Sequence, residues 1–169
     1  MIKLHQYQLK GLQLTTAKRI AMSGVAAVEF ALLLPIMILL VFGISEYGRA
    51  LYQYNTLVKT VRDSARFLTQ YNPADGAYPL KEAKCLVIYG NTSCTGSKLV
   101  PGLTIAMVNV CNPVVCPIGY TIIVPNAGTI NLVEVKITGF QFQSLVPFAT
   151  NNTKLLNFGN IKVTMRQVL

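Results

Sequence analysis

The most uneven feature of the chain is an apolar run near its N-terminus. Residues 30–45 contain no charged side chain, and the longer stretch from Ala21 to Ser45 contains one, Glu29. A helix of about 20 mostly apolar residues is long enough to cross the hydrocarbon core of a bilayer. The pattern therefore predicts a transmembrane helix over residues 25–45.

Beyond this run the apolar spacing stays helical. Apolar residues recur every three or four positions, at Ile44, Tyr47, Leu51, Tyr54, Val58, Val61, Ala65 and Leu68. The spacing predicts an amphipathic helix over residues 46–71, continuous from about Val25 and ending before Pro73, because a proline disfavours helical geometry in the preceding residue. We expect the distal half of this stripe to pack on the chain's own domain, and the part from Tyr47 to Tyr54 to face other subunits.

Pro35 lies in the middle of the apolar run. A proline has no backbone N–H, so the carbonyl of Ala31 loses its helical partner. The sequence therefore predicts a helix kink or local unwinding at Pro35.

Residues 72–169 are predicted to form a small α+β domain after the turn-rich segment 72–78. Residues 79–89 favour a short helix that starts at Pro79 and stops at Gly90, although 85–89 also fits a strand. Strands are expected at 103–110, 120–124, 132–142 and 161–168, and the alternation over 133–138 is typical of an antiparallel sheet with one solvated face. The predicted fold is α+β, with a long N-terminal transmembrane and stalk helix packed on this sheet.

Charge is scarce and unevenly placed. Of 169 residues 12% are charged and 52% are hydrophobic, the mean hydropathy is +0.46, and the net charge is +9. This composition excludes intrinsic disorder. Four bases and no acid precede the apolar run, so residues 1–24 form a basic leader that the positive-inside rule places in the cytoplasm, with the chain after Ser45 translocated. No segment is dense in Lys and Arg with interleaved aromatics, so we expect no nucleic-acid partner.

All four cysteines follow the apolar run, in the part expected to reach an oxidising compartment. They allow three disulfide pairings. A Cys111–Cys116 bridge would bracket a hairpin turn, which leaves Cys85 and Cys94 as the other pair. A zinc site is disfavoured because the one histidine, His5, lies in the leader.

The residues after the membrane offer no catalytic constellation. They include no histidine for a nucleophile-base relay, no Gly-rich phosphate loop and no pair of acids on one helical face. Glu46 has Arg49 three residues on, and the simplest interpretation of that pair is a local helical ion pair. We expect neither enzymatic activity nor a cofactor or metal.

Glu29 is the informative residue of the apolar run, because a carboxylate inside a membrane helix costs about 2.5–3.5 kcal/mol on insertion scales. It stands fifth after Gly24 and is followed by Phe30, behind a basic leader. This pattern resembles the class III signal of type IV pilin-like proteins. The resemblance implies cleavage between Gly24 and Val25 by a prepilin peptidase on the cytoplasmic side. The new ammonium of Val25 would pair with Glu29 of a neighbouring subunit and set the register of helices in an assembly.

From Ser23 onward the chain also resembles the TadE-like family, the pseudopilins of tight-adherence (Tad/Flp) pilus systems. The matching pieces are Leu34-Pro35, Phe42-Gly43, Glu46-Tyr47-Gly48-Arg49, Asp63-Ser64-Ala65-Arg66 and the later segments 133–148 and 161–166. The resemblance implies a type IV pilin-like fold and a minor pilin that acts in pilus assembly, initiation and adherence. It implies a single pass through the inner membrane, a periplasmic or extracellular domain over 72–169, and partners among other pilins and the pilus assembly platform.

Two alternatives stay open from the sequence. The chain could keep its leader as a membrane-anchored assembly scaffold that never enters a filament. It could also be a secreted binding module that signal peptidase releases after Ser45, since small residues precede that bond.

Overall fold

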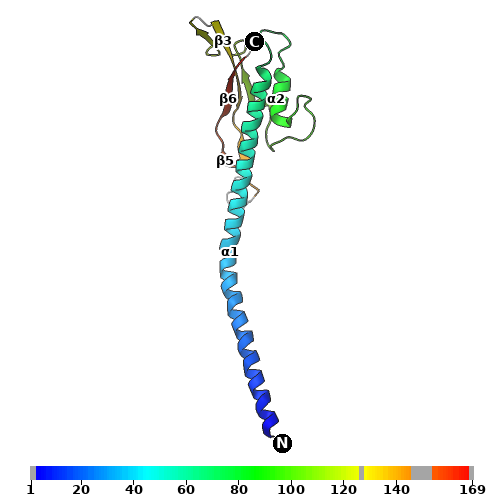
Figure 1. Cartoon of the computed structure of the whole chain (residues 1–169), viewed down its shortest axis with the longest axis vertical. Helices are drawn as coiled ribbons and strands as arrows, with labels where there is room; N and C mark the ends of the chain where they lie inside the picture. The colour runs from blue at the N-terminus through cyan, green and yellow to red at the C-terminus, as the bar shows by residue number, and fades with distance from the viewer. Residues whose placement is uncertain (1–2, 126–127, 146–153, 168–169) are drawn as a thin grey trace. The chain divides into compact units, whose positions relative to one another are not determined.

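A computed structural model describes the backbone of residues 3–125, 128–145 and 154–167, and the side chains of these ranges except 3–23 and 154–156. Its elements, labelled in Figure 1 where there is room, are the helices α1 (Lys3–Leu68) and α2 (Leu80–Tyr89), the 3-10 turn η1 (Ile105–Met107), and the strands β1 (Val108–Cys111), β2 (Thr121–Val124), β3 (Gly128–Ile137), β4 (Gln141–Gln143), β5 (Lys154–Asn157) and β6 (Ile161–Arg166). The chain divides into two compact units, Met1–Ser45 and Glu46–Leu169. Each unit is described by itself.

The first unit consists of the N-terminal part of α1. The helix begins at Lys3, so the predicted start near Val25 is wrong. Residues 3–23 contain no proline and a single glycine, Gly11, so nothing in them interrupts helical hydrogen bonding. The helical backbone is continuous across Pro35. The kink expected there stays a prediction.

The second unit is built around β3. This long strand pairs antiparallel with β1 over residues 134–137, with β6 over 132–137 and with β2 over 128–131. β4 and β5 form a separate antiparallel pair. The long apolar helix, the antiparallel sheet and two disulfides confirm the predicted α+β class.

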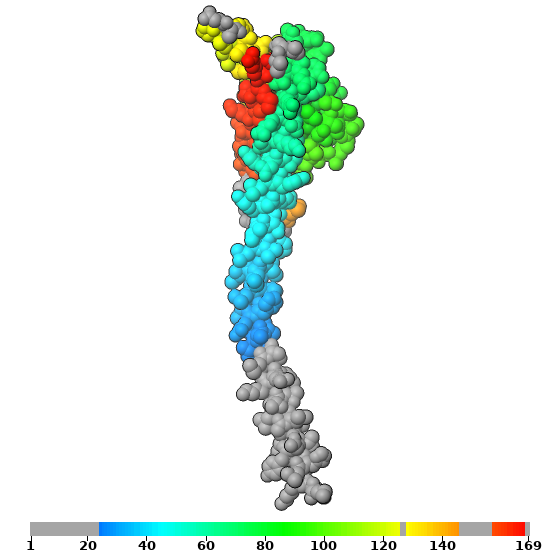
Figure 2. Space-filling view, in the orientation of Figure 1, coloured from blue at the N-terminus to red at the C-terminus, as the bar shows by residue number. Residues whose placement is uncertain are grey.

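The core lies between the sheet and the part of α1 that belongs to this unit. Val133, Val135 and Ile137 of β3 are fully buried, as the predicted alternation requires. They belong to one apolar cluster with Leu57, Val61 and Leu68 of α1. In Figure 2, β6 and α2 flank this part of the helix. Burying a Val, Leu or Ile side chain contributes about 1.5–3 kcal/mol, so the cluster holds sheet and helix together.

The buried face of α1 differs from the predicted stripe in its proximal half. Ala50, Gln53 and Leu57 are buried, whereas Tyr47 and Leu51 are exposed. Tyr47 and Leu51 follow the helical apolar spacing, but in this part of α1 that spacing does not coincide with the face that packs on the domain. Farther along, Val61, Ala65 and Leu68 are buried as predicted.

α1 ends at Leu68, three residues before the predicted Tyr71. The backbone then tightens, because Gln70 N–H bonds to Phe67 O at 3.4 Å and Tyr71 N–H to Leu68 O at 3.3 Å. Such bonds between residues three apart are common in the last turn of a helix. The chain therefore leaves the helix before it reaches the residue next to Pro73.

α2 confirms the helix predicted for residues 79–89. Pro79 occupies the N-cap position, one residue before the place predicted for it, and Gly90 ends the helix with a left-handed φ of 72°. Ser64 Oγ of α1 donates to Ala83 O of α2 at 2.8 Å, and both residues are fully buried. Their small side chains allow the two helices to approach closely.

Two predicted strands have other bounds. The expected strand 103–110 contains η1, and the strand itself, β1, begins at Val108. The expected strand 132–142 is divided, because Gly139 takes a φ of 73° and turns the chain between β3 and β4. β5 was not predicted. β2 and β6 lie where they were expected, and residue 168 is outside the described range.

Both expected disulfides are present. Cys85 of α2 is joined to Cys94, and Cys111 at the end of β1 is joined to Cys116. The first bridge ties the buried face of α2 to the loop after it. The second closes the turn that follows β1.

A matched pair of substitutions on α1 tests the register of the core. Leu57 is fully buried and Leu51 is 44% exposed. We expect Leu57→Ala to lower the free energy of unfolding by about 3 kcal/mol, because it leaves a cavity in the core. Leu51→Ala should change it by less than about 0.5 kcal/mol. Denaturant unfolding of the full chain in detergent micelles measures both, and equal losses would contradict the observed register.

Candidate functional site

The sequence-predicted processing and assembly residues lie on one exposed stretch of α1. Gly24, Val25, Glu29, Phe30 and Pro35 all fall between residues 24 and 45, where every residue is exposed. This helix is long and apolar enough to cross a membrane, and none of its most apolar window is buried in the chain. In water such a surface is strongly unfavourable, so lipid or other apolar helices must cover it.

Gly24 has no structural reason within the described chain to be a glycine. A Cβ placed on it would meet nothing within 4 Å, and its φ lies outside the left-handed region. A glycine in a helix interior costs about 1 kcal/mol relative to alanine. The packing of the described chain therefore does not require a glycine at this position.

Glu29 has no ion-pair partner within the described part of the chain. The one ion pair within the described residues joins Glu46 to Arg49. One helical turn before Glu29 lie Val25 and Ala26. A positive charge at Val25 would therefore be a neighbour of this carboxylate along the helix.

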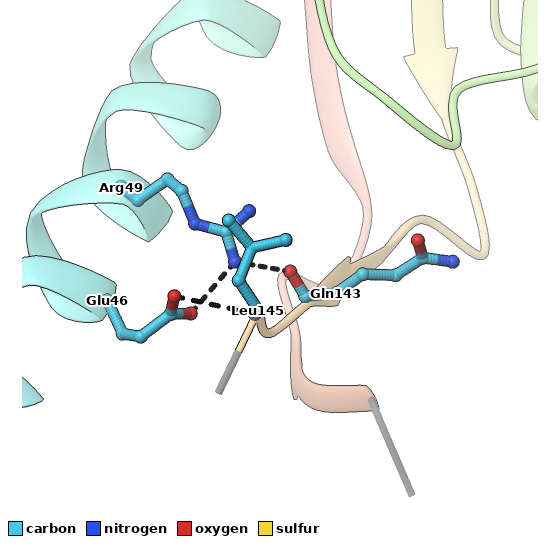
Figure 3. A network of polar contacts seen from close by, with 4 residues as sticks. All are labelled: Glu46, Arg49, Gln143 and Leu145. Carbon is cyan, nitrogen blue, oxygen red and sulfur yellow. Dashed lines mark hydrogen bonds and ion pairs between the residues drawn. The ribbon is translucent and has the colours of Figure 1, made fainter. Parts of the chain in front are cut away.

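In the second unit, Glu46 and Arg49 join α1 to the end of β4 (Figure 3). Arg49 Nη2 donates to Glu46 Oε2 at 2.8 Å and to the carbonyl oxygen of Gln143 at 2.6 Å. Glu46 Oε1 accepts from the backbone N–H of Leu145 at 3.4 Å. The expected local ion pair is confirmed, and it also holds a segment more than 90 residues away in the sequence. We call Glu46, Arg49, Gln143 and Leu145 the ionic clamp.

Arg49 also lies on an aromatic cluster. Its guanidinium carbon is 4.6 Å from the centroid of the Phe142 ring, a distance that suits a cation–π contact. Phe142 is buried and contacts Phe158, which also packs against Phe140 and Tyr54. The ring positions restrict the guanidinium, so the clamp depends on packing as well as on charge.

The surroundings of Glu46 favour its ionised form. The hydrogen bond from Arg49 is the largest cause that lowers the pKa of the Glu46 carboxyl, and the side chain of Ser144, the charge of Arg49 and the N–H of Leu145 lower it further. Partial burial opposes these effects. The carboxylate is therefore charged at neutral pH and strengthens the clamp there.

Tyr47, Leu51 and Tyr52 of α1 stay exposed, at 64%, 44% and 71% of their surface. None of the three belongs to the apolar cluster of the second unit. The expectation that the segment from Tyr47 to Tyr54 faces other subunits stays a prediction. Tyr54 differs from the others because it packs edge-on against Phe158, with ring centroids 5.5 Å apart.

Sequence reasoning found half of the ionic clamp. The spacing of Glu46 and Arg49 revealed their ion pair, but nothing marked Gln143 and Leu145, since both contribute backbone atoms and not side chains. The alternation of Gln141, Phe142 and Gln143 was the available signal, because it puts one aromatic side chain on the inner face of a short strand.

Comparison with known proteins identifies the N-terminal segment. Residues 24–66 match the family model described as TadE-like protein. The match confirms the resemblance over this segment, which includes Gly24, Glu29 and the ionic half of the clamp. The match ends within α1, before the turn that leads to α2. No curated protein and no solved structure matches the chain.

The clamp makes stability depend on pH. A lowered pKa in the folded state means that Glu46 stabilises the fold above its ordinary pKa of 4.5 and loses this contribution as the pH falls through the folded value. We expect Glu46→Gln to be less stable than wild type by about 1–2 kcal/mol at pH 7 and nearly equal to it at pH 3. Thermal unfolding at both pH values measures this difference, with Asp63→Asn on the exposed face of α1 as control. A Glu46→Gln deficit that persists unchanged at pH 3 would contradict the role of the charge.

Proposed function

We propose that the chain is a minor pilin-like subunit, or pseudopilin, of a Tad/Flp type IV pilus. A prepilin peptidase would remove residues 1–24 by cutting between Gly24 and Val25. The remaining helix would hold the subunit in the inner membrane, with the domain of residues 72–169 in the periplasm or outside the cell. There the subunit would act in pilus assembly, initiation and adherence, together with other pilins and the assembly platform.

The observation that carries this proposal is where the family match begins. It starts at Gly24, on a glycine that the packing of the described chain does not require, and five residues before the one acid of the apolar run. A peptidase that reads a small residue at its cleavage position accounts for such a glycine. The basic leader lies outside the match.

Cleavage would also give Glu29 its counter-charge. The new N-terminus at Val25 would be an ammonium next to the positive end of the helix dipole, and a carboxylate in the first turn is stabilised by both. In hydrocarbon an unpaired carboxylate is costly, so the ammonium of a neighbouring subunit would offset its desolvation. Helices that pair in this way gain a defined register, which Leu and Ile surfaces alone do not provide.

Assembly with other subunits agrees with the uncovered surface of α1. Residues 24–45 of the first unit are exposed without interruption, and Tyr47, Leu51 and Tyr52 of the second unit are exposed as well. Large exposed apolar patches mark interfaces with proteins or lipid. Gly43 and Gly48 have open space around them, which allows another helix to approach closely.

The mature N-terminus is the decisive measurement. Chain extracted from membranes of a host that carries the pilus peptidase should begin at Val25 and lack the mass of residues 1–24. Gly24→Val should leave the leader attached, because a β-branched side chain fills the small cleavage position. Gly43→Val, the same change elsewhere on α1, should be cut like wild type.

Each alternative predicts another N-terminus. A wild-type chain that keeps all of its leader would be an unprocessed scaffold, and a start at Glu46 would identify a module released by signal peptidase. Either result would overturn the proposed processing.

The role of Glu29 has its own test. Glu29→Gln removes the charge but keeps the size, so we expect it to reduce incorporation into pili at least about tenfold if the ion pair contributes 1.4 kcal/mol or more. Met37→Gln adds an equally polar neutral group elsewhere in the apolar run and should assemble nearly like wild type. Quantitative immunoblots of sheared pili and membranes measure both variants, and normal incorporation of Glu29→Gln would contradict the pairing.

A further inference from the structure

The outward face of the sheet carries a cluster of basic side chains. Inward residues of β1, β3 and β6 are buried or half-buried in the core, so the residues that alternate with them face outward. We call five of these outward residues the basic sheet face: Asn109, Lys136, Lys162, Thr164 and Arg166. All are exposed except Lys136, which is half-buried.

The strand register places like charges opposite one another. Lys136 of β3 pairs with Lys162 of β6, and Asn109 of β1 stands on the other side of Lys136. Directly opposed residues have Cβ atoms about 4.5–5.5 Å apart, and like charges there destabilise the sheet. A neutral residue in place of either lysine would remove this repulsion and stabilise the pairing of β3 with β6.

No acid in the described chain forms an ion pair with these lysines, although Glu134 lies beside them on the same side of the sheet. Glu134 is the acid on this side of the sheet, but it is 9% exposed and accepts a hydrogen bond from Thr164 Oγ1 at 3.1 Å. It also lies close to Tyr120, where burial and then the charge of Glu134 raise the pKa of the phenol. The one ion pair among the described side chains joins Glu46 to Arg49. Lys136 and Lys162 therefore have no ion-pair partner in the described part of the chain.

A second copy of the chain is a poor source of the missing anions. The sequence has six acids against 15 bases. Glu29 lies in the apolar run, Glu46 belongs to the clamp and Glu134 is buried in the sheet. The remaining acids are separated along the chain, at Asp63, Asp75 and Glu82. A second copy would therefore bring few anions to three bases on one sheet.

The character of the face favours a polymer of sugars over a protein. Stable protein interfaces have an apolar core, whereas the exposed side chains on this side of β1, β3 and β6 are bases, an amide and a hydroxyl, and Cys111 and Leu132 beside them are half-buried. Lysine and arginine bind carboxylate and sulfate groups, and Asn109 and Thr164 can exchange hydrogen bonds with sugar hydroxyls. Lys162 and Arg166 are four residues apart on β6, or about 13 Å, so a repeating anion can contact both ends of the face.

We propose that the basic sheet face binds an acidic polysaccharide through Lys136, Lys162 and Arg166. The anions of the polymer lie between the opposed lysines and remove their mutual repulsion. This site is independent of cleavage at Gly24, because its residues all belong to the second unit. It gives the domain a ligand class that the family match does not supply.

The test uses the purified full chain in uncharged detergent and measures binding to polygalacturonate and dextran sulfate, with neutral dextran as the uncharged probe. We expect Lys136→Gln/Lys162→Gln to weaken binding to the acidic polymers about tenfold or more at low salt. Each lost cation should also reduce the slope of log affinity against log salt by nearly one, as for other polyanions. Neutral dextran should not bind.

A matched control separates a local site from net charge. Lys81→Gln/Lys84→Gln on α2 removes the same charge from one exposed and one half-buried lysine, and it should bind like wild type. Equal weakening by both double variants would overturn the proposal, as would failure of the wild type to bind either acidic polymer. Tighter binding to polyglutamate or to a DNA oligonucleotide would also overturn it, in favour of an acidic protein or a nucleic acid.

Stability provides an independent readout. Since the lysines repel each other, Lys136→Gln/Lys162→Gln should unfold at the same temperature as wild type or at a higher one. If this variant does not fold, Lys162→Gln alone changes one exposed side chain and should still weaken binding about threefold. An unchanged affinity of a folded Lys162→Gln variant would contradict the site.

Discussion

Burial of β3 against α1 is the interaction on which the second unit depends. Val133, Val135 and Ile137 lose all of their exposed surface there, and the strands on both sides of β3 are held in register by it. The second sheet, β4 and β5, has two short strands, and the buried residues of β3 belong to one apolar cluster with α1. The same helix therefore has to present an apolar surface to the sheet in one stretch and remain uncovered in another. Leu57 and Leu51, six residues apart on α1, illustrate the two conditions, since one is fully buried and the other is 44% exposed.

The ionic clamp lies where the apolar cluster of the second unit has ended. Ala50 and Gln53 are the buried residues of α1 nearest to it, and neither offers much apolar area. Arg49 donates a hydrogen bond to the backbone of β4 and Glu46 accepts one from the backbone just after it, and these bonds add to the burial of Phe142 in holding that segment. A charged hydrogen bond contributes about 1.5–3 kcal/mol, more than a surface ion pair alone. The aromatic ring beneath Arg49 keeps part of the pair away from water, which explains why an i,i+3 pair has a structural role here.

Much of this architecture was predictable because it follows from periodicity. The apolar run, the burial of Val61, Ala65 and Leu68, the short helix at residues 80–89 and the alternation in β3 each rest on a local repeat. The pairing of the cysteines followed from short loops that bring both ends together. Periodicity did not mark Ala50 and Gln53, which lie off the predicted apolar stripe and are buried.

Other features depend on contacts between distant segments and leave little trace in the sequence. The break between β3 and β4 required a left-handed Gly139, and glycine alone does not specify that conformation. The clamp partners Gln143 and Leu145 bind through backbone atoms, which every residue has. The opposition of Lys136 and Lys162 required the register of two strands 26 residues apart, although each lysine was visible as an outward residue.

The scarcity of acids connects these observations. Three of the six acids have a distinct setting: Glu29 is in the apolar run, Glu46 holds β4 and Glu134 is hydrogen-bonded within the sheet. A domain selected only for stability would place another acid opposite Lys136, since an opposed pair of unlike charges stabilises a sheet by about 0.2–1 kcal/mol. The sheet instead sets a second lysine there. Because the repulsion is small compared with the burial of β3, the fold tolerates it, and the positive charge stays available to whatever approaches from outside.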